Sequence, residues 1–159
     1  MSETVPSALP APPAEERVAL LRKLLEDVSS AARGAEALDN RIYCLAHGWD
    51  SMTIDHDPFP RYYVRMRTAA GREIHQEIPL REIPSYTSSV DDALALLHST
   101  FAGWGLGLEV GLYTTSAQLL PPDRSRAHGE SLAPTPPLSI VSAVLRTSLE
   151  LQAPEAAHE

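Results

Sequence analysis

Apolar residues recur at helical spacing in several stretches of the chain, and this pattern predicts helices. The first helix is expected over Ala14–Ser30, where the stripe consists of Val18, Leu21, Leu25 and Val28. A shorter helix is expected over Ala35–Ala46, with Leu38, Ile42 and Leu45 facing inward. Two more helices are predicted downstream, one after Ser89 and one after Thr135.

The stretch Pro84–Leu97 (PSYTSSVDDALALL) has the features of a helix start. Ser88 or Ser89 can cap the helix, and an aspartate follows three residues after each, at the spacing of a capping box. The buried stripe would then consist of Val90, Ala93, Leu94 and Leu97. This interpretation explains the serines and aspartates without any chemistry.

The last helix is predicted to begin at Thr135, which we expect to act as its N-cap. Pro136 and Pro137 then fall in the first turn, where a missing N–H costs no hydrogen bond. One apolar stripe runs through the helix, formed by Leu138, Val141, Leu145 and Leu149. We expect this to be the principal helix of the core.

A β-hairpin is predicted where Tyr62–Arg67 and Arg72–Ile78 flank Ala69–Gly71, a loop that suits a three-residue turn ending in glycine. This geometry sets opposite charges or polar groups across from each other on one face. On the other face it pairs apolar residues, as cross-strand packing favours. The resulting pairs are Arg67 with Glu73, Arg65 with His75, Met66 with Ile74, and Tyr62 with Ile78.

Strict alternation of apolar and small or polar residues over Trp104–Tyr113 predicts another strand. We expect its large residues to share one buried face: Trp104, Leu106, Leu108, Val110 and Leu112. Three glycines fall on the opposite face, so a close-packed element, a bend or a ligand is expected there. A returning strand is predicted over Thr114–Leu120, and a polar loop over Asp123–Ala133.

Together these elements predict an α+β fold, in which a small antiparallel sheet, made of the hairpin plus two further strands, is sandwiched or covered by helices. One domain is expected over residues 14–152. Residues 1–13 contain four of the chain's 14 prolines and are expected to form a flexible tail. Residues 153–159 are expected to fray.

The charge of the chain narrows the possible partners. Thirteen Lys and Arg against 21 Asp and Glu give a net charge of −8. This balance disfavours non-specific binding to nucleic acid and docking on an anionic membrane. The N-terminus has no secretory pattern, no apolar run reaches membrane-spanning length, and Cys44 is the single cysteine. A reducing cytoplasm is therefore the expected compartment.

Candidate catalytic and metal-binding groups are few. Cys44 and His47 share a helix face but supply at most half of a zinc site. Asp55–Asp57 (DHD) could hold a divalent ion, although the neighbouring prolines favour a solvated turn. His128 with Ser88 or Ser89 could form the histidine–serine pair of a hydrolase, but the sequence contains no nucleophile elbow. We therefore expect no enzyme activity, no metal and no cofactor.

Aromatic residues and helix starts are the remaining candidates for ligand or partner contacts. Trp49, Tyr86 and Trp104 could stack on a planar ligand or anchor a protein, although core packing is the simpler explanation. The helix starts near Ser88 and Thr135 present N–H groups to an anion. The candidate contact residues are thus Trp49, Tyr86, Thr87, Ser88, Trp104 and Thr135.

In the order and spacing of several segments, the chain resembles the phage ABA sandwich domain family of phages and prophages. The likeness covers about residues 35–150, and the segments that carry it are LDNRI (38–42), HGW (47–49), YTSSVDDAL (86–94), Trp104, APTPPL (133–138) and AVLR (143–146). The resemblance implies an α/β sandwich with an antiparallel sheet. It implies no activity, because the family has none that could be carried over.

Three functions follow as hypotheses. The first is a phage or prophage accessory protein that binds a protein partner or itself without catalysis. The second is a protein that binds or sequesters a small anionic or aromatic ligand such as a nucleotide. The third is a minor hydrolase that uses His128 and a serine.

Overall fold

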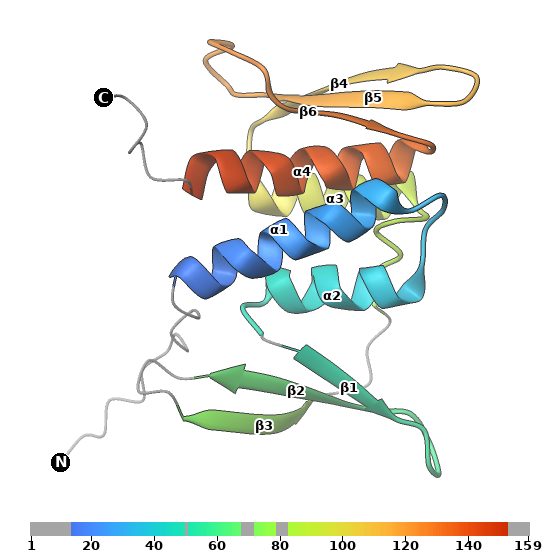
Figure 1. Cartoon of the computed structure of the whole chain (residues 1–159), viewed down its shortest axis with the longest axis vertical. Coiled ribbons are helices and arrows are strands. Elements are labelled where there is room, and N and C mark those ends of the chain that lie inside the picture. Colours follow the sequence, from blue (N-terminus) through green and yellow to red (C-terminus); the bar gives the residue numbers. More distant parts are fainter. Residues whose placement is uncertain (1–13, 50, 68–71, 79–82, 153–159) are drawn as a thin grey trace, which may run out of the picture.

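The computed structural model describes residues 14–49, 51–67, 72–78 and 83–152. Within these ranges, two layers of helices lie between two small sheets, one at each end of the molecule (Figure 1). The predicted tail, the predicted frayed end and the hairpin loop at Ala69–Gly71 fall outside the described residues.

The helices occupy the predicted positions. They are α1 (Ala14–Ser30), α2 (Glu36–Ala46), α3 (Val90–Thr100) and α4 (Pro136–Gln152). Ser89 caps α3, since its side chain accepts a hydrogen bond from the backbone N–H of Asp92. The predicted capping of α3 is therefore confirmed, with Ser89 as the capping residue.

Six strands form two antiparallel sheets. The first sheet has the order β1–β2–β3, with bounds Ser51–Asp55, Arg61–Arg67 and Glu73–Ile78. The second has the order β4–β5–β6, with bounds Gly105–Val110, Thr115–Leu120 and His128–Ala133. The predicted α+β class is confirmed, while the strands divide between two sheets and include β1 and β6, which the sequence pattern did not reveal.

The predicted hairpin register is confirmed at all four positions. Arg67 lies opposite Glu73, Arg65 opposite His75, Met66 opposite Ile74, and Tyr62 opposite Ile78. The two faces of the first sheet therefore remain distinct, and Val64, at the centre of its apolar face, is fully buried.

Helix α4 is the centre of the core, as predicted. It packs against β5 and β6 on one side and against α1 and α3 on the other. Because both sides are covered, the helix is buried all round through its first three turns rather than along one stripe. Even Ser139, Ser142 and Thr147 are almost completely inaccessible to solvent.

Strand β6 corrects the prediction of a polar loop over Asp123–Ala133. Its buried positions are occupied by Gly129, Ser131 and Ala133, residues too small to produce an apolar pattern. A bulge interrupts the pairing of β5 with β6 between Ala117 and Leu119, and Gly129 adopts a left-handed conformation there, with φ 63°. A side chain at Gly129 would collide with Thr147 and with the carbonyl of Ala143, so α4 requires glycine at this point.

Two predicted apolar stripes are buried only in part. In α3, Ala93 and Leu97 are buried as expected, but Leu96 takes the place of Val90, which is 40% exposed. In β4 the large residues do share one face, because Leu106 lies opposite the buried Leu119. That face becomes exposed to solvent along the strand, since β4 is an edge strand and α4 packs mainly against β5 and β6.

Candidate functional site

Thr87, one of the candidate contact residues, forms an internal clamp between two helix starts. Its backbone N–H and its hydroxyl each donate to Asp39 Oδ1, both at 2.8 Å. Its Oγ1 accepts a hydrogen bond from the N–H of Ala35 at 2.9 Å. Thr87 is 1% exposed, and its side chain already makes these hydrogen bonds within the fold. It is therefore not available to a ligand.

The neighbours of Thr87 are also engaged within the fold. Tyr86 is 7% exposed and belongs to the core cluster, and its burial raises the pKa of the phenol to about 12. Ser88 lies so close to Gly34 that a side chain there would collide with its hydroxyl. The segment PSYTSS (84–89) therefore packs the start of α2 against the loop that leads into α3.

Trp49 belongs to a cluster of rings at the end of α2. Its indole stacks on His47 with ring centroids 4.6 Å apart, and it meets Tyr43 edge-on at 5.7 Å. The ring nitrogen Nδ1 of His47 lies 2.8 Å from the carbonyl oxygen of Tyr43. This cluster fixes the chain as it leaves α2 and enters β1.

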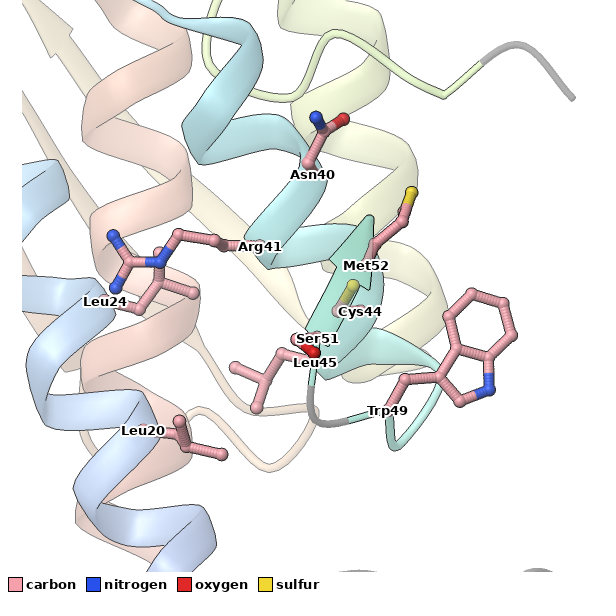
Figure 2. A pocket seen from close by; sticks show the side chains of 9 residues that line it. All are labelled: Leu20, Leu24, Asn40, Arg41, Cys44, Leu45, Trp49, Ser51 and Met52. Atoms are coloured by element: carbon pink, nitrogen blue, oxygen red, sulfur yellow. The ribbon is translucent and has the colours of Figure 1, made fainter. Parts of the chain in front are cut away.

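A cavity of about 270 Å³ lies beside this cluster, between α1, α2 and β1. Figure 2 shows Leu20 and Leu24 on the α1 side of the cavity and Trp49 and Met52 on the opposite side. The lining is mainly apolar, which favours a small apolar or aromatic molecule over a nucleotide. Trp49 is the one candidate contact residue that borders this cavity.

Of the polar groups at the cavity, Arg41 and Cys44 are already engaged or unreactive, whereas the buried Oδ1 of Asn40 has no hydrogen-bond partner within the described residues. Arg41 is bound to Asp27, with 2.6 Å between Nη1 and Oδ2, and this hydrogen bond is the main reason why the pKa of Asp27 is lowered. Cys44 is buried, and desolvation raises the pKa of its thiol to about 11. A thiol in this state is a weak nucleophile and a weak metal ligand at neutral pH.

Trp104 lies at a different place, against Phe101 and His128. Its ring centroid is 5.0 Å from that of Phe101 and 5.5 Å from that of His128. His128 Nδ1 is 3.2 Å from Glu150 Oε2. The partner of the imidazole is thus a carboxylate on α4, and neither Ser88 nor Ser89 takes that position.

Thr135 does not cap α4 with its side chain. Its Oγ1 is buried and has no hydrogen-bond partner within the described residues, while its carbonyl accepts from the N–H of Ser139. Pro136 and Pro137 have no N–H, and the N–H of Leu138, which a capping hydroxyl could also reach, is not bonded to Thr135 Oγ1, so the prediction of a Thr135 side-chain cap is wrong. The same prolines leave little at this helix start to bind an anion.

The described residues contain no group of three or more His, Cys, Asp and Glu side chains that could hold a metal ion. At Asp55–Asp57 the backbone N–H of Asp57 donates to Asp55 Oδ1 at 3.1 Å, an ordinary turn. No helix in the described part of the chain is both long enough and apolar enough to cross a bilayer.

Three residues of the predicted buried face, Leu108, Val110 and Leu112, lie instead on the surface. Leu108 is 40% exposed and Val110 63%, and the hairpin tip that follows carries Leu112 at 95% and Tyr113 at 86%. We call these four residues the β4 strip. They follow one another along β4 and the turn after it, with Glu109 and Gly111 between them.

The glycines of β4 have a local explanation. A side chain at Gly107 would press on that of Gln118, which lies across the strand from it. Gly111 donates its N–H to the carbonyl of Thr114 and closes the turn between β4 and β5. Close packing therefore accounts for Gly107 and, against the carbonyl of Thr114, for Gly111, whereas a side chain at Gly105 would make only ordinary contacts with Leu120.

In comparisons with known proteins, no family model, no curated protein and no solved structure matches the chain.

Proposed function

We propose that this chain is a non-enzymatic protein-interaction module that binds its partner through the β4 strip. A phage or prophage origin and action in the cytoplasm of the bacterial host belong to the same proposal, and they rest on the likeness of sequence segments described above. The observation that carries the proposal is the exposure of the β4 strip.

Exposed apolar side chains that adjoin one another are unusual on a monomeric protein and commonly mark contact sites. Full burial of one such side chain contributes about 1.5–3 kcal/mol, so four of them could supply much of the free energy of a specific complex. Leu112 and Tyr113 project at the hairpin tip, where a partner can enclose them on several sides. Tyrosine is also among the residues that most often dominate binding energy.

The test compares three forms of the protein. The first is the wild type, the second is the double variant Val110→Ser, Tyr113→Ser, and the third is Leu132→Ser, which alters a residue that is 66% exposed on the outer face of β6. Proteins captured from a bacterial lysate are identified and purified, and their affinities for all three forms are then measured by calorimetry.

The expected result is a dissociation constant at least about tenfold weaker for the double variant, equivalent to about 1.4 kcal/mol. The Leu132→Ser variant should bind like the wild type. Circular dichroism and thermal unfolding verify that each variant is folded. Equal affinity of all three forms for every partner would overturn the proposal.

A second candidate function, binding of a small ligand, is favoured by the cavity between α1, α2 and β1. A ligand present at 100 times its dissociation constant adds about 2.7 kcal/mol of stability, so a thermal shift screen of nucleotides and small aromatic compounds detects it readily. The control is Leu20→Trp, which narrows the cavity from its partly exposed rim. A stabilising compound should lose its effect on this variant, and a compound that stabilises both forms equally binds elsewhere.

A further inference from the structure

We propose that the partner of the β4 strip is a second copy of this chain, and that the two β4 strands pair antiparallel across a twofold axis. This inference rests on the proposed function and specifies its partner. The sheets β4–β5–β6 of the two copies would then join edge to edge into one continuous sheet.

The edge of β4 lacks the features that normally prevent such pairing. Natural edge strands are protected by bulges, prolines, or charged side chains, in particular lysine. The opposite edge of the same sheet, β6, carries the bulge at Gly129. In the other sheet, the edge strand β3 carries Glu73, His75 and Glu77 on its polar face.

Strand β4 pairs with β5 without a bulge over all six residues, Gly105–Val110. Its sequence, GLGLEV, contains no proline and no lysine, and its single charge is Glu109. Among the described residues, its only extensive contacts are with β5. Its second edge is therefore open along the length over which its apolar side chains are exposed.

The strand is complementary to itself in one register. A twofold axis normal to the sheet keeps each side chain on its own face, so a strand must pair with its copy about a single residue. Centred on Leu108, the pairing sets Leu108 against Leu108 of the second copy, and Leu106 against Val110. These residues lie on the helix-facing side, together with the buried Ala117 and Leu119.

The charges agree with this register. Glu109 lies on the outer face and would stand opposite Gly107 of the second copy, so the two carboxylates do not face each other. A pairing centred on Glu109 would place like charges in direct opposition, which destabilises a sheet. Gly105 and Gly107 carry no side chain that could obstruct an approaching backbone.

The first test is the mass of the protein in solution, measured by sedimentation equilibrium at concentrations up to about 1 mM, because an interface built from one short strand and its apolar strip is at the small end of specific interfaces. The wild type should approach dimer mass as concentration rises. Val110→Lys should stay monomeric, because it places two ammonium groups beside an apolar strip. Leu132→Lys, altered at an exposed position on β6, should dimerise like the wild type.

The second test is disulfide trapping. Facing Cβ atoms on paired strands lie about 4.5–5.5 Å apart, close enough for a disulfide after small adjustments. Under mild oxidation Leu108→Cys should cross-link to itself, and a mixture of Leu106→Cys and Val110→Cys should yield the mixed dimer. Leu132→Cys is the control for random collision, and it shares with the other variants the native Cys44, which is buried in the structure.

Cross-linking of Leu108→Cys no faster than Leu132→Cys, or a monomeric wild type throughout the concentration range, would overturn the inference. Preferential coupling of Leu106→Cys to Leu108→Cys would also overturn it, because that result places the axis at Gly107. The two proposals can fail separately. If the wild type is monomeric but the double variant Val110→Ser, Tyr113→Ser loses affinity for an identified partner, the proposed function holds and only the second copy is excluded as the occupant of the β4 strip.

Discussion

Asp39 and Thr87 are 48 residues apart in sequence and are joined by two hydrogen bonds to one carboxylate oxygen, Oδ1, each 2.8 Å long. Both residues are buried. Since Thr87 Oγ1 also accepts the N–H of Ala35, a single side chain binds the start of α2 to the loop that leads into α3. Hydrogen bonds to a buried carboxylate are among the stronger polar interactions in a protein, so this clamp should fix the angle between the two helices.

Thr87→Val should destabilise the protein by about 1.5–3 kcal/mol, because it removes the hydroxyl donor to Asp39 and leaves the N–H of Ala35 without its acceptor. Thr87→Ser keeps both hydrogen bonds and should cost much less. Urea denaturation provides the free energies of unfolding. In a double-mutant cycle with Asp39→Ala, the two changes should be coupled by about 1 kcal/mol or more, and strictly additive costs would show that the clamp contributes little.

The two predicted helix caps should differ in their response to mutation. Ser89→Ala removes the acceptor for the N–H of Asp92 and should cost about 1 kcal/mol. Thr135→Val should be neutral or slightly stabilising, because it replaces a buried hydroxyl that has no partner within the described residues. A loss of about 1 kcal/mol in Thr135→Val would mean that this hydroxyl does cap α4. Both values are obtained from denaturant titrations, with far-ultraviolet circular dichroism as the probe.

A position can require glycine because its φ is positive or because a side chain would collide with a neighbour. Three glycines allow these two causes to be measured separately. Gly48 has a positive φ of 74° but open space where a side chain would point, so Gly48→Ala should cost only about 1–2 kcal/mol of backbone strain. Gly34 has no positive φ but lies against Ser88 and the carbonyl of Thr87, so Gly34→Ala tests steric collision.

Gly129 combines both causes, since its φ is positive and its Cα faces Thr147 and the carbonyl of Ala143. Gly129→Ala should therefore be the most destabilising of the three, exceeding Gly48→Ala by about 1–3 kcal/mol because overpacking a core adds about that much. The midpoints of thermal unfolding rank the variants. If Gly48→Ala and Gly129→Ala lowered the unfolding midpoint equally, the close approach of β6 to α4 would add nothing to the cost of a side chain at Gly129.

The elements that sequence reasoning located are those in which large apolar residues produce a clear period. The hairpin register could be predicted because charged and apolar pairs alternate along Tyr62–Arg67 and Glu73–Ile78. Strand β6 could not be predicted because its buried positions hold the small residues Gly129, Ser131 and Ala133, which give no apolar period, and at Gly129 α4 approaches too closely for a side chain.

The wrong prediction that the apolar face of β4 is buried has a different origin. Periodicity shows which residues share a face, and Leu106, Leu108 and Val110 do share one, but it does not show whether another element covers that face. Coverage depends on where α4 lies in the tertiary structure. The same limit applies to Thr87, whose partner Asp39 is distant in sequence, and to the cavity, whose lining comes from three elements.

Cys44 should make the stability of the protein dependent on alkaline pH. Burial raises the pKa of its thiol to about 11, against 9.0 for a free thiol, so the folded state retains the proton longer than the unfolded state. For a group whose pKa is raised by folding, the contribution to stability is complete below the unfolded pKa and is lost as pH rises toward the folded pKa. The affected window is therefore about pH 9–11, and about 1.4 kcal/mol should be lost by pH 10, at 1.36 kcal/mol per unit.

The measurement is urea unfolding at about pH 8 and about pH 10. Burial raises the pKa of Tyr86 from 10.0 to about 12, so this phenol begins to reduce stability near pH 10, but it does so equally in the wild type and in Cys44→Ala and cancels in their difference. Cys44→Ala is less stable at both values because it enlarges the cavity, but its loss between them should be smaller than that of the wild type by about 1.4 kcal/mol. Alkylation supplies an independent check: iodoacetamide should modify Cys44 in the native protein far more slowly than in the unfolded chain. Rapid native modification, together with equal pH dependence of the two forms, would show that this thiol is exposed often enough to titrate normally.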